Sequence, residues 1–421
     1  MQSPIRRRDT GTTGALSRGS IRGKAVTALA VAALCAPGVV AAAPASAATP
    51  AETPAQAPAE RSAAQAQPGD VISSEPTEFK VFGVPTPTHA WKVQYASTNA
   101  RGEANTVSGT VLVPLGEHDG PRPLVTYAVG TVGIGDQCAP SANFPKGTAN
   151  EAALIEGALL RGWAVAVTDY EGLGTPGTHT YTVGRAAGTA VLDAARAAQR
   201  LPEAQEKGVT LESPVGIMGY SQGGQASGWA AELSGSYAPE LKVKGTASGG
   251  VPADLPKVAD YNNGDAEAGL VLMSAIGHDA AHPELALDKY LNDEGKRIAG
   301  IMRDGCLAES SEAGANKSIE DVTVSDPNQE PDWQQRLRED LLGTKAPGHP
   351  VYVYHGEADE IIPHEVGQKL RADWCAQGNT VQWKSYPLAP HAGTAILASV
   401  PAMNWLSDRF KDEPTQGNCG S

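Results

Sequence analysis

The chain has 421 residues, of which 41% are hydrophobic, so it can bury a sizeable core. Its formal net charge is −14, and no polybasic run follows the N-terminal segment. This acidic balance argues against nucleic-acid binding and against a basic patch that would hold the protein on a membrane.

The N-terminus has the pattern of a secretory signal peptide, which we expect to span residues 1–47. Several basic residues precede an apolar run at 25–43, and small residues then offer a cleavage site after Ala47. Pro37 and Gly38 interrupt the apolar run, which disfavours a retained membrane anchor. The sequence therefore predicts a secreted, extracellular protein.

A flexible leader is expected next, because residues 48–69 are rich in Ala, Pro and Gln and cannot bury a core. The folded domain is predicted to cover 70–421. Outside the signal peptide the chain has four cysteines, an even number that suggests two disulfides in an exported protein. The residues alone leave all three pairings open. The four are Cys138, Cys306, Cys375 and Cys419.

Two or three strands are expected first, and strands then alternate with helices. The predicted strands are 78–84, 89–97, 105–114, 123–130, 163–169, 214–219, 243–250, 350–356 and 381–387. The predicted helices are 150–162, 184–201, 222–234, 364–378 and 391–410.

This alternation predicts the α/β fold class, with a mainly parallel sheet covered by helices on both faces. The pattern breaks between about 252 and 346, where the sequence is polar with helical pieces and no clear strand. We interpret this stretch as a helical cap inserted into a single domain. Its most apolar part, 269–276, could pack in the core of the cap or contact acyl chains or a lipid interface.

Ser221 lies between a predicted strand and a predicted helix, in the sequence GYSQG. Gly-x-Ser-x-Gly in this context is the nucleophile elbow, a sharp turn that exposes the serine at the carboxyl end of the sheet. Side chains at Gly219 or Gly223 are expected to collide with the neighbouring strand and helix. An ordinary glycine-rich turn is the alternative interpretation, but the flanking elements favour the nucleophile.

A serine hydroxyl needs a base, and in this fold an acid and then a histidine follow the serine along the chain. His391 follows the last predicted strand, on a loop, and is the preferred base. His355 and His364 flank the preceding strand and its loop, and they are the alternatives.

The acid is expected at the end of the preceding strand, in HGEADEIIP. Asp359 is preferred over Glu357 and Glu360 because the residues after it, 361–363, lead the chain back into a helix. Asp359 would accept the second ring N–H of His391 and stabilise the imidazolium.

An oxyanion hole needs two backbone N–H groups. One is expected from Gln222, the residue after the nucleophile, and the second from the loop after an earlier strand. That loop contains the Gly130–Thr131 step, and Thr131 is the preferred donor, although the glycines could also mark a simple turn.

No metal or cofactor site is expected. His278 and His282 stand four residues apart, but no third ligand is evident and Pro283 follows. The sequence has no phosphate loop, no dinucleotide fingerprint and no CxxC pair.

Several segments together resemble the secretory lipase (LIP) family of α/β-hydrolases, and most closely its actinobacterial secreted branch. They are GDVISSEP, SGTVLVP, GTVGIGDQCAPS, TDYEGLGTPGTHTYTVGRAAGTAVLDAARAA, GYSQGGQA, HGEADEIIP and the PH at 390–391. The resemblance covers nearly all of the chain from Asp70 onward. It differs from many hydrolases at Val129, where a histidine often precedes the glycine, and this leaves the second oxyanion donor open.

The resemblance implies an α/β-hydrolase fold and a carboxylic ester hydrolase with the triad of Ser221, Asp359 and His391. It also implies two disulfides, Cys138–Cys306 between core and cap and Cys375–Cys419 at the C-terminus.

The sequence thus predicts a secreted serine ester hydrolase that cleaves acylglycerols or related fatty-acyl esters without a cofactor, with transient contact between the cap and a lipid interface. The alternatives are a short-chain esterase, a prolyl-type serine peptidase on the same fold, and a non-catalytic lipid- or wall-binding protein. Oligomeric state cannot be predicted from the sequence.

Overall fold

The computed structural model describes residues 66–420. The predicted signal peptide and residues 48–65 of the predicted leader lie outside the described residues. The described residues begin four positions before the predicted domain boundary. Gly69 is buried and its N–H donates to the carbonyl of Ala96 at 2.7 Å, while the carbonyl of Pro68 accepts from the guanidinium of Arg200 at 2.9 Å. Pro68 and Gly69 therefore pack against the domain.

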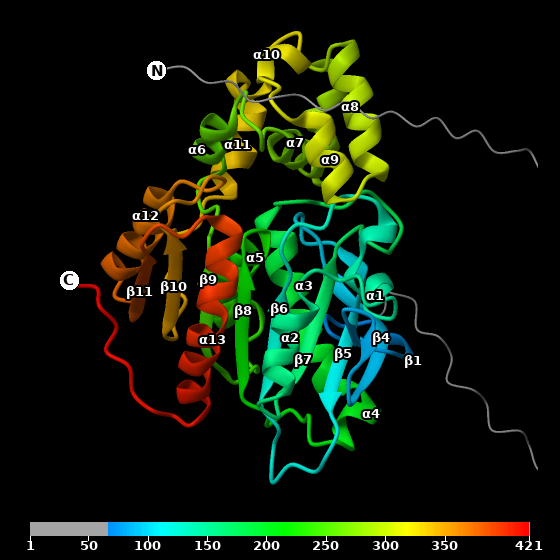
Figure 1. The fold of residues 1–421 in the computed structure, drawn as a ribbon, viewed down its shortest axis with the longest axis vertical. Helices are drawn as coiled ribbons and strands as arrows, with labels where there is room; N and C mark the ends of the chain where they lie inside the picture. Colours follow the sequence, from blue (N-terminus) through cyan, green and yellow to red (C-terminus); the bar gives the residue numbers. More distant parts are fainter. Residues whose placement is uncertain (1–65, 421) are drawn as a thin grey trace, which may run out of the picture. The chain divides into compact units, whose positions relative to one another are not determined.

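A nine-stranded sheet in the order β1-β4-β5-β7-β6-β8-β9-β10-β11 forms the centre of the described chain (Figure 1). The pairs β1–β4, β4–β5 and β5–β7 are antiparallel, and the remaining pairs are parallel. The strands are β1 (Val71–Thr77), β4 (Thr88–Thr98), β5 (Ala104–Pro114), β6 (Leu124–Ala128), β7 (Ala164–Tyr170), β8 (Val215–Tyr220), β9 (Val243–Gly249), β10 (Val351–Gly356) and β11 (Val381–Tyr386).

The central strands are short apolar runs because helices cover both of their faces. Every residue of β6, β7, β8 and β10 is buried. Helices α2 and α13 lie on one face of the sheet, and α3, α5 and α12 lie on the other (Figure 1). The helices outside the cap are α1 (Pro140–Asn143), α2 (Ala152–Leu159), α3 (Gly184–Arg200), α4 (Pro202–Gln205), α5 (Gln222–Tyr237), α12 (His364–Ala376) and α13 (His391–Phe410), with the 3-10 helix η2 (Asp136–Cys138).

The prediction of a sheet strand at 78–84 is wrong. This stretch forms a separate small hairpin of β2 (Lys80–Val81) and β3 (Val84–Pro85). Phe82 and Gly83 both have positive φ, 49° and 80°, and make the tight turn that the strand interpretation overlooked.

Between β9 and β10 the chain leaves the sheet and forms a helical subdomain, drawn above the sheet in Figure 1. We call residues 252–346 the cap; within it, the described residues add no strand to the central sheet. Most members of a second buried apolar cluster come from the cap, among them Met273, Ile298 and Trp333, and the core adds Ile134 and Tyr181. The helices of the cap are α6 (Leu255–Asn262), α7 (Gly269–Ala281), α8 (Asp293–Asp304), α9 (Leu307–Gly314), α10 (Ile319–Val322) and α11 (Pro331–Glu339), with the 3-10 helices η3 (Pro283–Leu285), η4 (Leu287–Lys289) and η5 (Pro327–Gln329).

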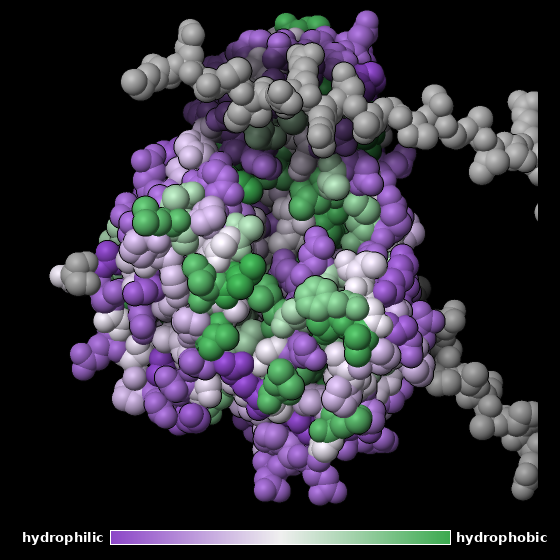
Figure 2. Space-filling model, in the orientation of Figure 1, coloured by the Kyte–Doolittle hydropathy of each residue, from purple (hydrophilic) through white to green (hydrophobic). Residues whose placement is uncertain are grey.

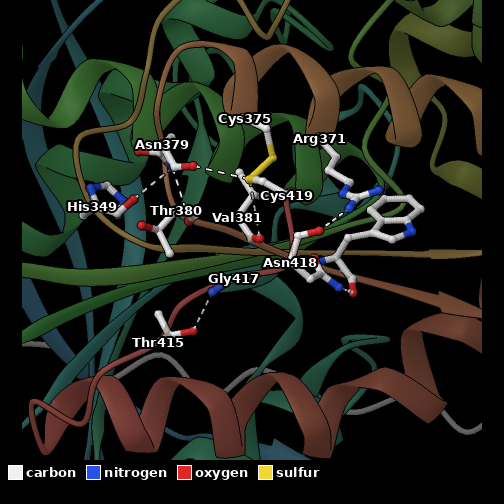
Figure 3. Close-up of a disulfide and its surroundings, with 11 residues drawn as sticks. His349, Arg371, Cys375, Asn379, Thr380, Val381, Thr415, Gly417, Asn418 and Cys419 are labelled. Atoms are coloured by element: carbon white, nitrogen blue, oxygen red, sulfur yellow. Dashed lines mark hydrogen bonds between the residues drawn. A yellow bond between two sulfur atoms is a disulfide. The ribbon is translucent and has the colours of Figure 1, made fainter. Parts of the chain in front are cut away.

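Two disulfides tie distant segments together. Cys138–Cys306 joins the core to the cap across 168 residues, and Cys375–Cys419 joins α12 to the C-terminal segment (Figure 3). These are the pairs that the family resemblance implied. Among residues 66–420, no helix is both long enough and apolar enough to span a membrane.

Candidate active site

Ser221 occupies the turn between β8 and α5, at the carboxyl end of the parallel sheet. Its backbone has φ 60° and ψ −123°, a conformation that is strained for any residue with a side chain. A Cβ at Gly219 would lie 2.1 Å from the carbonyl oxygen of Gly223, and a Cβ at Gly223 would lie 2.0 Å from that of Ala128. Both glycines are therefore required by the packing of this turn, for the reason expected from the sequence.

His391 and Asp359 form a buried pair. His391 begins α13 just after β11, and Asp359 lies in the loop after β10. The Nδ1 atom of His391 is 2.8 Å from Oδ2 of Asp359, and the two residues are 7% and 5% exposed. Glu360 instead accepts a hydrogen bond from the backbone N–H of His391 at 2.9 Å, whereas Glu357 is exposed. Of the three candidate acids, Asp359 is the one that contacts the imidazole.

The carboxylate of Asp359 is held on both of its oxygens. Oδ1 accepts the backbone N–H groups of Ile361 at 3.0 Å and Ile362 at 2.8 Å, and Oδ2 lies between the rings of His391 and His355. Burial alone would raise the pKa of Asp359, but the interactions with His355 and His391 outweigh burial and lower it below its usual range. The carboxylate therefore stays ionised beside His391.

Tyr220 connects this pair to the nucleophile turn. Its ring lies 4.9 Å from the ring of His391, centroid to centroid, and its hydroxyl donates to the carbonyl of His391 at 2.8 Å. Because Tyr220 immediately precedes Ser221, the structure gathers the serine, the histidine and the acid at one end of the sheet, as expected for ligand sites in parallel sheets.

The alternative bases, His355 and His364, have other hydrogen-bond partners. The Nε2 atom of His364 is 2.7 Å from the hydroxyl of Ser385, on the neighbouring strand. His355 is fully buried on β10, and its Nε2 atom lies 3.0 Å from the carbonyl of Ile362. Of the three candidates, His391 is the one whose ring contacts Tyr220, the residue before Ser221.

The loop after β6 carries the predicted second oxyanion donor. The N–H of Gly130 donates a hydrogen bond to Oε1 of Glu151 at 2.6 Å, and the hydroxyl of Tyr127 donates to Oε2 at 2.6 Å. Burial raises the pKa of Glu151, although its two hydrogen bonds oppose this. The hydroxyl of Thr131 contacts that of Tyr181 at 2.8 Å. Glu151 thus removes the Gly130 amide from the possible donors and orients the loop at Thr131.

Gln222, which is expected to be the first oxyanion donor, follows Ser221 directly. As the first residue of α5, it has a backbone N–H with no partner inside the helix. Its side-chain amide lies 3.1 Å from Nε2 of His179, whose Nδ1 donates to the carbonyl of Glu171 at 2.9 Å. Since Nδ1 carries the proton, Nε2 accepts the hydrogen bond from Gln222. Burial lowers the pKa of His179 to about 4, which keeps the ring neutral.

Sequence reasoning missed the roles of His179 and Glu151. Their partners lie 43 and 21 residues away in the chain, and neither residue belongs to a short catalytic motif. The one available signal was the position of His179 inside the DYEGLGTPGTHTYTVG segment that carries the family resemblance.

An apolar cavity of about 110 Å³ lies between the cap and the core, with Ser221 and Gln222 in its lining. Figure 2 shows the surface hollowed there, with hydrophobic side chains in the hollow. Segment 269–276 contributes both to this lining and to the buried core of the cap. Its packing in the cap core is thus confirmed, and its contact with acyl chains or a lipid interface stays a prediction. The other apolar contributors include Leu255, Val258, Leu291, Ile298, Ile361 and Ile362.

The two cap histidines do not share a site. The ring of His278 binds Asp340 through Nε2 at 2.8 Å and the carbonyl of Ser274 through Nδ1 at 2.9 Å, so both of its nitrogens are occupied. Among the described residues, no cluster of His, Cys, Asp and Glu could hold a metal ion.

Comparison with known proteins gives consistent matches. A family model described as secretory lipase matches residues 143–418. The chain is 29% identical over 367 residues to the probable inactive lipase MT1628 of Mycobacterium tuberculosis, covering 83% of this chain and 80% of that protein. It is 28% identical over 369 residues to the secreted triacylglycerol lipase LIP3 of Malassezia globosa, with the same coverages. The closed state of Candida antarctica lipase A superimposes with a TM-score of 0.77 at 25% identity, covering 85% of this chain and 86% of that one.

Proposed function

The chain belongs to the secretory lipase family of α/β-hydrolases and is a secreted carboxylic ester hydrolase, and from this premise we propose that Ser221, His391 and Asp359 are its catalytic triad. The observation that carries the proposal is the buried His391–Asp359 pair, linked through Tyr220 to the strained turn at Ser221. Asp359 fixes the tautomer of His391 by accepting its Nδ1–H, so that Nε2 is free to take a proton.

In the proposed reaction, the Ser221 hydroxyl attacks the ester carbonyl while His391 accepts its proton. The negative charge that develops on the carbonyl oxygen is stabilised by the backbone N–H groups of Gln222 and Thr131. His391 then protonates the departing alcohol and leaves an acyl group on Ser221. A water molecule, deprotonated by His391, releases the carboxylic acid and restores the serine.

The natural substrates are proposed to be acylglycerols or related fatty-acyl esters, with the acyl chain in the cavity beneath the cap. The cavity begins at Ser221 and Gln222 and is lined chiefly by apolar side chains from the cap. An apolar lining gains free energy from burying each methylene of a bound chain, about 0.8 kcal/mol per group. The cap at 252–346 thus acts as the acyl-binding part of the domain.

The test is the hydrolysis rate of the purified mature protein on p-nitrophenyl esters of increasing acyl length, with Ser221→Ala as control. We expect rates that persist to long chains, and a loss on the order of 10⁴- to 10⁶-fold in kcat for Ser221→Ala. Rates confined to short chains would make the protein a short-chain esterase. Cleavage of a proline-linked chromophore in place of esters would overturn the proposed substrate class.

A further inference from the structure

A second histidine lies against the carboxylate of Asp359. His355, four residues earlier on β10, has its Nε2 atom 3.2 Å from Oδ2 of Asp359 and 3.0 Å from the carbonyl oxygen of Ile362. The N–H of the same Ile362 donates to Oδ1 of Asp359 at 2.8 Å. His355 therefore contacts both the carboxylate and the peptide group that hydrogen-bonds to it.

The tautomer of His355 follows from its partners. A carbonyl oxygen can only accept, so the proton of the ring lies on Nε2, where it points at Ile362 and lies close to Asp359. The other nitrogen, Nδ1, is buried and has no hydrogen-bond partner among the described residues. The ring is 0% exposed, so it touches neither solvent nor substrate.

The packing around the ring makes room for an imidazole. A Cβ at Gly367, in the first half of α12, would lie 2.4 Å from Nδ1 of His355. Glycine inside a helix is less favourable than alanine because it loses more backbone entropy on folding. The helix thus carries an unfavourable residue at the position where any larger one would displace the ring.

We propose that His355 is a positioning residue of the triad, which holds Oδ2 of Asp359 toward His391 and fixes the 359–362 turn through Ile362. This inference rests on the proposed function. It assigns to His355 a role through Asp359, and the ring itself takes no part in proton transfer to the substrate.

The test compares two amides at position 355. The side-chain nitrogen of glutamine stands as many bonds from Cβ as Nε2 of histidine, so His355→Gln keeps a donor at the required place. The nitrogen of asparagine corresponds to Nδ1, so His355→Asn removes that donor. We expect His355→Asn to lower kcat on the order of 10²-fold with KM unchanged, and His355→Gln to recover most of kcat. Thermal melts check that both variants fold, and His355→Leu replaces the asparagine variant if that one does not.

Asp359→Asn, alone and combined with His355→Asn, separates this inference from the proposed triad. If His355 acts through Asp359, His355→Asn should lower kcat only slightly further in a protein that already carries Asp359→Asn. Equal kcat values for His355→Gln and His355→Asn would overturn the positioning role. The same would follow if His355→Asn lowered kcat as much in the Asp359→Asn background as it does alone. Wild-type kcat in Asp359→Asn alone would instead overturn the triad.

Discussion

At the scale of single residues, the turn at Ser221 depends on the absence of side chains at Gly219 and Gly223. Ser221 has a positive φ, and on either side of it Gly219 approaches the backbone of α5 and Gly223 approaches the end of β6 too closely for either to carry a side chain. The strain is therefore maintained by the surrounding packing, as is common where a reactive group must be presented.

Gly223→Ala is predicted to destabilise the protein and to lower kcat, because its methyl group would overlap the carbonyl of Ala128. Overpacking of this kind costs about 1–3 kcal/mol. Gly235→Ala, in the same helix but with no atom within 4 Å of the new methyl, is the matched control and should be neutral or stabilising. Urea unfolding and ester hydrolysis measure the two effects, and similar results for both variants would contradict the steric account.

The buried ring of His179 makes the stability of the fold depend on pH. Its pKa in the folded protein is lowered to about 4 by burial, below the ordinary value of 6.5, so the unfolded chain binds the proton more readily. The stability from this group is present above about pH 6.5 and is lost as the pH falls toward 4.

His179→Gln should therefore reduce the fall in the free energy of unfolding between pH 7 and pH 4.5, as measured by urea unfolding at several pH values. His118→Gln, at an exposed position, serves as the control and should leave the slope unchanged. An unchanged slope in His179→Gln would show that this ring is not held neutral by the fold.

At the scale of elements, the C-terminal segment protects the outer edge of the sheet. The backbone N–H of Asn418 donates to the carbonyl of Val381, and its side chain bonds to both the N–H and the carbonyl of Trp383 on the edge strand β11. The disulfide between Cys375 and Cys419 holds the segment in place (Figure 3). An edge strand covered in this way is not free to pair with another chain.

The two disulfides are predicted to stabilise the protein unequally. Replacing both cysteines of a pair by serine should cost about 2–5 kcal/mol, and about 1 kcal/mol more for Cys138–Cys306, because it closes 168 residues and Cys375–Cys419 closes 44. Thermal unfolding of the two double variants gives the comparison. A larger loss from the shorter loop would contradict a chain-entropy explanation.

Much of this arrangement could be predicted from the order of elements, because buried parallel strands are apolar runs and the helices between them are periodic. The edge strand β1 was missed because its sequence, VISSEPT, is mostly polar and largely exposed. The placements of Asp359, His391 and Gln222 follow from chain order in this fold. The contacts of His179, Glu151 and His355 could not be predicted, since they arise from packing between separate segments and not from a local pattern.

At the scale of the whole molecule, the domain combines a sheet with Ser221, Asp359 and His391 at its carboxyl end and a helical cap that supplies most of the apolar lining of the cavity at Ser221. The cap is joined to the core by a buried cluster that also includes Ile134 and Tyr181, and by the Cys138–Cys306 disulfide. Under the proposed function, cap residues would alter acyl binding while Ser221, Asp359 and His391 keep their positions.

Val271→Trp is predicted to lower hydrolysis of long-chain esters selectively, because Val271 lines the cavity and a larger ring would fill it. Short-chain esters should be affected by less than threefold or so, since the triad remains in place. Val324→Trp, the same change at a cap position that is 69% exposed, is the control. Equal losses on short and long esters would place the acyl chain elsewhere.

Ser221 is proposed as the activated nucleophile, and the name of one relative, a probable inactive lipase, makes a direct test of this serine worthwhile. The most direct measurement is to treat the purified protein with a serine-directed phosphonate and to locate the adduct by peptide mass spectrometry while following residual esterase activity. We predict one adduct per chain, on Ser221, formed in proportion to the loss of activity and absent from Ser221→Ala. Labelling at another residue, or full inactivation with Ser221 unmodified, would show that Ser221 is not the nucleophile.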